Sequence, residues 1–524
     1  MKLLIIEDCE GMGIRCLSDV FKNFINLSHL SVLHIFYLVG IEFLWQWSSA
    51  PPCDQLEVSS FSPLCGLEEL RLHRLPNLVG LFYGESEPYL FPAGPFSSLK
   101  QLRISGCHNM KQLFTVQLLQ NLQNLEKLEV YDCKGLEEIA ADGNGVGQGG
   151  REGIQLISSG ATAVVILPKL KSLSLDNLPQ LKNVCKSAMI CDSIEEIKIF
   201  NCPKVKRLPL FLSSIDGPSY LFPAGTFSSL EQLRISGCHN MKQLFTVQLL
   251  QNLQNLETLG VQDCEGPEEI AADGNAIGQG GGEGIQLTSS EGATANVILP
   301  KLRWLSLNGL PQLKNICKAA MICNSIEEIK IFNCPKVKRM PSFLSSIDGP
   351  PYLLPTGTFS SLKELWIFGC HNMKQLFTVQ LLQNLQNLEQ LIVKDCEGLE
   401  EIAADGNGVG QGGGEGIQLT SSEGATANVI LPKLRWLSLN GLPQLKNICK
   451  AAMICDSIRE IEICYCPKVK RLPLFLSTIN GLPSPPSTLR KIKGNQEWWE
   501  SLEWDNPSAK NALYPFFFTL QWDN

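Results

Sequence analysis

The chain has 524 residues, of which 44% are hydrophobic and 18% are charged, and its formal net charge at pH 7 is −8. The length and the hydrophobic content suffice for a large core in more than one compact part. The mild net charge and the lack of a long basic run exclude the electrostatic footprint that nucleic-acid binding leaves on a sequence.

The N-terminal residues carry no export or membrane signal. The first apolar stretch, at residues 3–6, is too short for a signal peptide, and no apolar run reaches the roughly 18 residues that a membrane helix needs. We therefore expect a cytoplasmic protein whose twenty cysteines are reduced rather than paired in disulfides.

Residues 1–95 contain the first copies of a short repeated motif, L-x-x-L-x-L-x-x-C/L, in which Ile or Val also occupies the leucine positions. The copies begin at Leu3, where the motif is cut short, at Leu30 and at Leu67. The L-x-L centre predicts a short strand, because alternate residues of a strand point to opposite faces. One such repeat cannot bury its apolar face alone, so neighbouring repeats must stack.

Three nearly identical modules of about 131 residues follow, at 96–226, 227–358 and 359–488. Each contains four copies of the motif, which brings the total to fifteen repeats. The sequence therefore predicts an α/β repeat solenoid with a parallel β-sheet on its concave side. The segment "TVQLLQNLQNLE", which begins at Thr115, has helical spacing and predicts short helices on an otherwise irregular convex side.

The stretch "SGCHNMKQLF" at 105–114, repeated at 236–245 and nearly so at 368–377, places a cysteine beside a histidine. Cys107 occupies the last position of the motif, where leucine stands in other copies, at Leu178, Leu310 and Leu442. A position that accepts leucine favours a buried, inert thiol over a nucleophile or a metal ligand. No acid or second ligand follows His108 at a fixed spacing, so we expect no catalytic residue and no metal site. The same position is held by Cys133, Cys202, Cys238, Cys264, Cys334, Cys370, Cys396 and Cys466.

Three further cysteine pairs lie six residues apart, a spacing that is unusual for a zinc site, and we interpret them as structural. They are Cys185 and Cys191, Cys317 and Cys323, and Cys449 and Cys455.

A glycine-rich tract begins at Asp142 and recurs from Asp273 and Asp405. Gly145, Gly147 and Gly150 match the letters G-x-G-x-x-G, but acidic residues flank the tract and no predicted strand leads into it. A dinucleotide site needs that motif between a strand and a helix. We therefore expect surface loops here and no cofactor.

The outward positions of the predicted strands differ among the modules, whereas the inward ones are kept. In the second repeat of each module the outward residues are Lys127, Glu129 and Tyr131, then Thr258, Gly260 and Gln262, then Gln390, Ile392 and Lys394. Differences also occur in the loops and edges, but this enrichment of variation on one face, with aromatic and charged residues, predicts a protein-binding surface. The residues that we predict to bind the partner are Arg103, Tyr131, Arg234, Trp304, Trp366, Phe368, Lys394 and Trp436.

The tail, residues 489–524, departs from the repeat pattern and is rich in large apolar residues. It offers Trp498, Trp499, Leu502 and Trp504, and then Leu513 before "PFFF". Because a solenoid needs its terminal repeats covered, we expect part of this tail to cap the last one.

The repeats, together with "LPKLKSLSLDNLPQLKNVC" and the tail "LRKIKGNQEWWESLEWDNPSAKNAL", resemble the C-terminal leucine-rich-repeat domain of plant nucleotide-binding disease resistance proteins of the coiled-coil class. This resemblance covers nearly the whole chain and implies a leucine-rich-repeat horseshoe that senses a pathogen effector or a guarded host protein. The coiled-coil and nucleotide-binding regions of such receptors have no counterpart in the sequence, so ATP or ADP binding is not carried over. A nucleotide-binding receptor acting in trans is a second expected partner.

Three other functions compete with this one. A substrate-recognition subunit or adaptor of a ubiquitin ligase also uses such repeats, but it would need an F-box-like helical segment where residues 1–60 already show the motif. An enzyme would need a recurrent acid and base pair, which the modules lack. An extracellular receptor domain would carry a signal peptide and more glycosylation acceptors than the one at Asn26.

Overall fold

The computed structural model describes residues 2–7, 14–21, 29–46, 64–83, 96–141, 165–185, 189–206, 208, 227–272, 297–317, 321–338, 340, 359–404, 429–449, 453–479, 481–504 and 506–520. The chain divides into two compact units. Unit 1 consists of Met1–Leu244 with Asn252–Leu256, and unit 2 of Phe245–Gln251 with Glu257–Asn524. The glycine-rich tracts predicted as loops lie outside the described residues.

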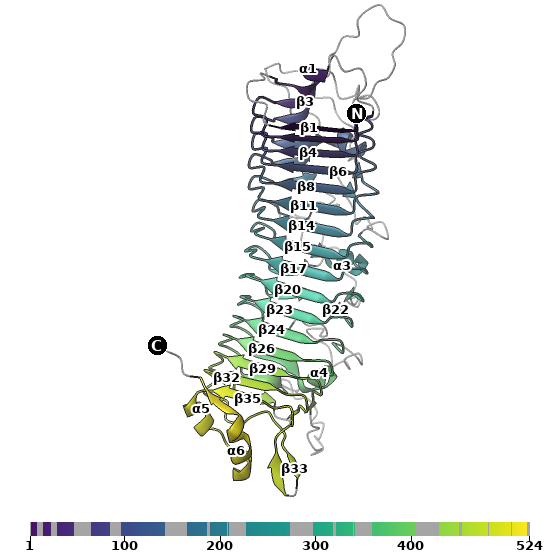
Figure 1. Cartoon of the computed structure of the whole chain (residues 1–524). Coiled ribbons are helices and arrows are strands. Elements are labelled where there is room, and N and C mark those ends of the chain that lie inside the picture. Colours follow the sequence, from purple (N-terminus) through teal and green to yellow (C-terminus); the bar gives the residue numbers. More distant parts are fainter. Residues whose placement is uncertain are drawn as a thin grey trace, which may run out of the picture. The chain divides into compact units, whose positions relative to one another are not determined.

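Unit 1 contains a parallel sheet in which strands follow one another in chain order (Figure 1). Its strands are β1 (Leu3–Glu7), β2 (Val32–Phe36), β4 (Glu69–His73), β6 (Gln101–Ser105), β8 (Lys127–Tyr131), β11 (Ser172–Asp176), β14 (Glu196–Phe200) and β15 (Gln232–Ser236).

Unit 2 repeats this arrangement with every strand parallel to the next. Its strands are β17 (Thr258–Gln262), β20 (Trp304–Asn308), β23 (Glu328–Phe332), β24 (Glu364–Phe368), β26 (Gln390–Lys394), β29 (Trp436–Asn440), β32 (Glu460–Cys464), β35 (Lys491–Gly494) and β36 (Phe517–Thr519). Each of the fifteen predicted repeats therefore has its strand. The inward leucines and isoleucines, such as Leu102 and Ile104, are buried.

A left-handed turn follows the strand in most repeats and returns the chain to the core. Gly106, Asp132 and Asn177 occupy this turn with φ of 67°, 49° and 53°, which explains why Gly, Asp and Asn recur before the last motif position. The next residue is buried, as predicted: Cys107 has 0% exposure, and its thiol donates to the Ser105 carbonyl at 3.7 Å.

Beyond the turn, the repeats form a second line of short strands, which the sequence did not predict. In unit 1 these are β3 (Phe43–Gln46) with β5 (Gly80–Tyr83), β7 (Gln112–Thr115) with β9 (Glu138–Ala141) and β12 (Asn183–Cys185), and β10 (Val165–Ile166) with β13 (Met189–Ile190). In unit 2 they are β16 (Phe245–Thr246) with β18 (Glu269–Ala272) and β21 (Asn315–Cys317), β19 (Val297–Ile298) with β22 (Met321–Ile322), β25 (Gln375–Thr378) with β27 (Glu401–Ala404) and β30 (Asn447–Cys449), and β28 (Val429–Ile430) with β31 (Met453–Ile454).

The predicted helical segments form short helices next to this second line. They are α2 (Val116–Gln120), α3 (Val247–Asn252) and α4 (Val379–Asn384), and α1 (Leu17–Phe21) lies near the N-terminus. The Thr115 hydroxyl begins α2 by accepting a hydrogen bond from the Leu118 amide at 3.2 Å, as an N-cap threonine does.

The C-terminal tail continues the sheet of unit 2, because β35 pairs with β32 and β36 pairs with β35. Between them lie α5 (Gln496–Glu500) and α6 (Pro507–Leu513), and a hairpin of β33 (Ser477–Ile479) and β34 (Leu482–Ser484) precedes them. The Trp499 ring is fully buried and stacks on Phe517 at 4.3 Å between centroids. The Trp498 indole donates to the Val469 carbonyl at 3.1 Å, which joins the tail to the last repeat.

Candidate protein-binding face

The residues at positions one, three and five of each main-sheet strand point away from the core, and we call this surface the open face. Because the strands pair in register, these residues form three rows across each unit. All eight residues predicted to bind a partner lie in these rows. Unit 1 carries Arg103, Tyr131 and Arg234, and unit 2 carries Trp304, Trp366, Phe368, Lys394 and Trp436.

Unit 2 holds an aromatic cluster on β23 and β24, formed by Phe332, Trp366 and Phe368. The rings of Phe332 and Phe368 stack at 4.6 Å between centroids with an interplanar angle of 20°. Trp366 lies nearly parallel to Phe368 at 6.4 Å. All three side chains are half-buried, so the cluster presents apolar area on the open face.

Two lysines cover parts of these rings. Lys330 Nζ lies 4.4 Å from the Trp366 ring centroid, and Lys394 Nζ lies 5.7 Å from the Phe368 centroid. Cations at such distances are attracted by the ring faces. The cluster therefore combines flat apolar surface with positive charge.

Ile392 takes an outward position of β26, as the alternation along the strand predicts, but it is not exposed. It lies opposite Trp366 on one side and Ser438 on the other, and only 3% of it is exposed because the flanking side chains cover it. Ser438 is also fully buried, and its hydroxyl has no hydrogen-bond partner among the described residues. On this part of the open face, two outward side chains, Ile392 and Ser438, are therefore buried.

The other two tryptophans lie on either side of this cluster. Trp304 begins β20 and Trp436 begins β29, each two strands from β24. Arg303 lies over the Trp304 ring, 4.5 Å from its centroid. The structure therefore brings Trp366, Phe368 and Lys394 together, whereas Trp304 and Trp436 occupy the row at the start of the strands.

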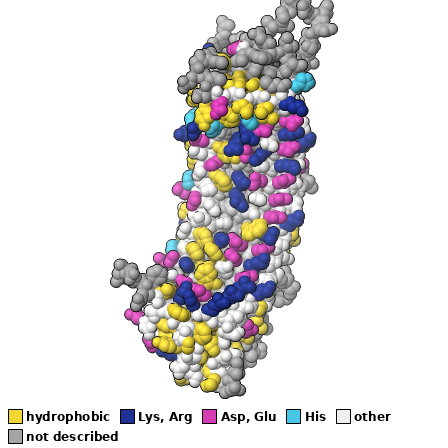
Figure 2. Space-filling model, in the orientation of Figure 1, with side chains coloured by type: hydrophobic (Ala, Val, Ile, Leu, Met, Phe, Trp, Pro, Cys, Tyr) yellow, Lys and Arg dark blue, Asp and Glu magenta, His cyan; other side chains and the backbone are white. Residues whose placement is uncertain are grey.

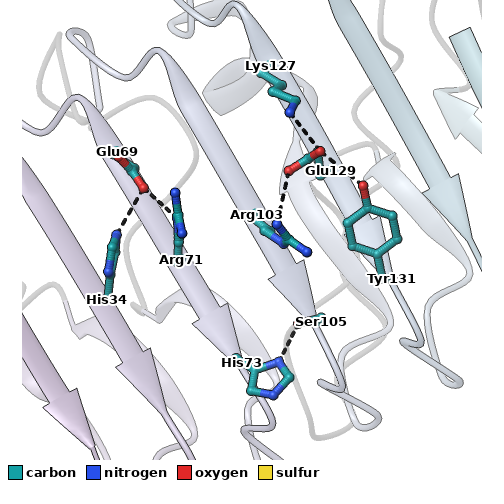
Figure 3. A network of polar contacts seen from close by, with 9 residues as sticks. All are labelled: His34, Glu69, Arg71, His73, Arg103, Ser105, Lys127, Glu129 and Tyr131. Carbon is teal, nitrogen blue, oxygen red and sulfur yellow. Dashed lines mark hydrogen bonds and ion pairs between the residues drawn. The ribbon is translucent and has the colours of Figure 1, made fainter.

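Unit 1 carries a polar network instead (Figure 3). Glu69 faces His34 Nε2 at 3.0 Å and Arg71 Nε at 2.5 Å. His73 Nδ1 lies 2.6 Å from the Ser105 hydroxyl. Partial burial, together with the positive charges of Arg74 and Arg103, lowers the pKa of His73.

The predicted pair Arg103 and Tyr131 belongs to the same network. The Arg103 guanidinium lies 5.3 Å from the Tyr131 ring centroid and 3.9 Å from the Glu129 carboxylate. Lys127 contacts Glu129 at 2.9 Å, and the Tyr131 hydroxyl donates to it at 3.0 Å. Although partial burial opposes ionisation, these contacts lower the pKa of Glu129 below its usual value, so the carboxylate is charged at neutral pH.

Sequence comparison among the modules missed several residues of this face. Lys330 and Phe332 belong to the segment EIKIF, which is identical in β14 and β23, so a search for variable positions passes over them. His34, Arg71 and His73 lie in repeats upstream of the modules and have no copies to compare. Their outward positions in the motif were the signal that could have found them.

In the cysteine and histidine pairs the two side chains lie in different environments, and other thiols at the same motif position are buried too. The thiol of Cys107 is buried while the His108 side chain is exposed. Burial raises the pKa of Cys202 and of Cys334 to about 12, which leaves these thiols protonated at neutral pH. Within the part of the chain that the structure describes, no group of three or more His, Cys, Asp or Glu side chains could hold a metal ion.

The repeats match a known sequence family. Residues 85–217, 212–348 and 349–481 each match the family described as plant disease resistance protein RPS2-like, leucine-rich repeats. These matches cover well over half of the chain. The chain belongs to this family. Its main-sheet strands are parallel and pair in register, as expected of a leucine-rich-repeat solenoid.

Curated relatives of this RPS2-like chain are disease resistance proteins of Arabidopsis thaliana. It is 27% identical to the disease resistance protein At4g27190 over 30% of the chain and 13% of the relative. It is 30% identical to the probable disease resistance protein At4g27220 over 39% of the chain and 20% of the relative. It is 24% identical to the disease resistance protein UNI over 58% of the chain and 29% of the relative. The chain thus spans less than a third of the length of each of these relatives.

Solved structures similar to this RPS2-like chain include another leucine-rich-repeat protein. One is a protein of Leptospira interrogans, with 14% identity and a TM-score of 0.30, which covers 75% of this chain and 84% of its own. Another is in the Toll–Spatzle complex of Drosophila, with 14% identity and a TM-score of 0.32, covering 94% and 62%. No helix in the described ranges is long and apolar enough to cross a membrane.

Proposed function

We propose that the chain is a non-catalytic recognition domain of plant immunity, which binds a protein partner on its open face in the cytoplasm. The partner would be a pathogen effector or a host protein that the receptor guards. Membership of the RPS2-like family supports the role in disease resistance. The aromatic cluster of unit 2 carries the proposal of binding, since half-buried Trp and Phe rings beside cations are typical of the residues that dominate protein interfaces.

Among these residues we expect Trp366 to contribute most to binding. Trp366 lies at the centre of the cluster, where it touches Phe368 and receives Lys330. Its indole Nε1 is covered and has no acceptor among the described residues. A partner that reorients this side chain could offer the missing acceptor and, at the same time, cover the ring.

The test is a binding titration on the full-length chain with a partner first recovered from plant tissue. Replacing Trp366 with Ala is expected to weaken binding by about 2 kcal/mol or more, as the loss of a central aromatic residue does. The combined Trp304, Trp366 and Trp436 alanine variant should lose binding altogether. Melting curves recorded in parallel separate lost affinity from lost folding, because Trp366 is half-buried and its removal also costs some stability.

Two control variants lie away from the open face. Gln120→Ala alters the end of helix α2, and Phe475→Ala removes an aromatic side chain that is 48% exposed and whose amide bonds to Met453 of the second strand line. Both should bind like the wild type. Equal affinity of the wild type and the triple tryptophan variant would refute the open face as the binding surface, and equal loss in the controls would move the surface to the helical side.

A further inference from the structure

We infer that the middle row of the open face in unit 1 binds an acidic segment of the partner. This inference rests on the proposed function, since it gives the chemistry of what that partner must present to unit 1. We call this set the cationic row; it consists of Arg71, Arg103, Lys198 and Arg234.

The register of the sheet places these four side chains in one line. Arg71 of β4 lies opposite Arg103 of β6, and Lys198 of β14 lies opposite Arg234 of β15. Glu129 and Ser174 occupy the two positions between these pairs. Each pair therefore consists of two cations that lie directly opposite each other on neighbouring strands.

Like charges directly opposite each other destabilise a sheet. One residue before the strands, acids and bases face each other across neighbouring repeats: Lys100 with Glu68 at 3.0 Å, and Lys171 with Glu195 at 3.6 Å. Figure 2 shows acidic and basic side chains close together on the surface of the molecule. In the cationic row two cations face each other directly in each pair, so an anion from outside the chain would relieve their repulsion.

The carboxylates near the row do not neutralise it fully. Arg71 and Lys198 each contact a glutamate on their own strand at 2.5 Å, Glu69 and Glu196. The closest carboxylate to Arg103 is 3.9 Å away, and the guanidinium side chain is 53% exposed. Arg234 is exposed and makes no ion pair with any residue that the structure describes. The row therefore offers at least two guanidinium groups with donors available to a ligand.

Aromatic side chains beside the row favour a peptide as the ligand. Tyr131 and Phe200 lie at the next outward positions of β8 and β14, two residues from Glu129 and Lys198. The row crosses five strand spacings of about 4.8 Å each, so its ends lie about 24 Å apart. An extended peptide of seven or eight residues covers that length at about 3.3 Å per residue.

The test measures binding of a fluorescently labelled octaglutamate peptide to the full-length chain by anisotropy, with octalysine as the charge-reversed probe. Octaglutamate should bind, and binding should weaken as salt shortens the Debye length from about 10 Å at 0.1 M to about 3 Å at 1 M. The variant Arg103→Gln/Arg234→Gln should bind at least about tenfold more weakly, since two ion pairs are lost.

The matched control is Lys100→Gln/Lys171→Gln. It removes the same amount of charge from unit 1, but from the positions one residue before the strands. It should bind octaglutamate within about twofold of the wild type, because these lysines already face Glu68 and Glu195. If both variants weaken octaglutamate binding equally, the peptide responds to the overall positive charge of unit 1 and not to the cationic row. That result would overturn the inference. So would a wild type that does not bind octaglutamate, or a single-stranded oligonucleotide of equal charge that displaces it more strongly.

The Trp366→Ala variant separates this inference from the proposed function. It should bind octaglutamate like the wild type while losing the protein partner. If Trp366→Ala loses the partner but Arg103→Gln/Arg234→Gln binds it normally and no acidic peptide binds, the cationic row is wrong and the aromatic cluster stands. If neither variant affects the partner, the open face itself is wrong.

Discussion

At the scale of single residues, the cysteines at the last position of the motif show how a turn position determines the chemistry of a thiol. Each follows a left-handed residue and enters the core, where the thiol donates to a backbone carbonyl two residues earlier, as Cys133 does to Tyr131 at 3.3 Å. The adjacent Cys133 thiol and burial both raise the pKa of Cys107 far above its usual value. The neighbouring histidine points outward and plays no part in this.

The first prediction concerns these thiols. Cys107→Ala should lower the free energy of unfolding by about 1–2 kcal/mol, because a small buried side chain is lost. Cys65→Ala should cost less, since Cys65 is only half-buried. Chemical denaturation of the three proteins measures both differences.

The same thiols should resist alkylation at pH 8 in the folded chain. With a pKa of about 12, only about one Cys202 or Cys334 thiol in ten thousand is ionised at that pH. Mass spectrometry after iodoacetamide treatment, with and without denaturant, would count the protected cysteines. Elemental analysis should find no stoichiometric zinc, and about one zinc per module would contradict the structural role.

At the scale of the strand, neighbours decide what an identical segment contributes. The segment EIKIF forms both β14 and β23. Phe200 of β14 lies opposite Ser236, whereas Phe332 of β23 lies opposite Phe368 and stacks on it. The aromatic cluster therefore arises from the pairing of strands and not from β23 alone.

The second prediction concerns the turn that ends β24. Gly369 has φ of 63°, and a Cβ there would lie 2.7 Å from the Asn333 side-chain oxygen. Gly369→Ala should destabilise unit 2 by about 1–2 kcal/mol from the left-handed conformation, with the contact adding to it. Gly369→Asn should cost less, since Asn tolerates this conformation and Asn333 itself adopts it with φ of 52°.

Gly481→Ala provides the matched control for this prediction. Gly481 has φ of 81°, but no described residue lies within 4 Å of a Cβ placed there, so its replacement reports the conformational cost. Thermal or chemical unfolding should rank the Gly369→Ala loss above the Gly481→Ala loss. A reversed order would mean that the Asn333 side chain moves aside at no cost.

At the scale of the whole molecule, the ends of the sheet decide solubility. In unit 2 the tail adds β35 and β36 beyond β32 and buries Trp498, Trp499, Leu502 and Leu513. Without the tail, β32 would expose a row of unpaired backbone groups, and exposed edge strands promote aggregation.

The third prediction follows from this arrangement. Deleting residues 489–524 should cause aggregation, detectable by light scattering and size-exclusion chromatography. A chain that ends at residue 520 keeps β36 and should remain soluble. A soluble, monomeric deletion of 489–524 would show that the last repeat needs no cover.

The sequence by itself determined the repeats, the strands and the inward residues, because each depends on a local pattern that recurs fifteen times. It also identified the outward rows, since alternation along a strand assigns each side chain to a face. The burial of Cys107 followed from the same pattern, because leucine replaces cysteine at that position elsewhere.

Only the tertiary structure decided which outward residues meet. Lys330 and Trp366 lie 36 positions apart in the chain, and although the motif aligns their strands, only the structure places the lysine over the tryptophan ring. The 3% exposure of Ile392 likewise does not follow from alternation along its strand, which assigns it to the outward face beside Trp366 and Ser438. The short second line of strands was missed because its two- to four-residue segments are too brief to show a period of their own.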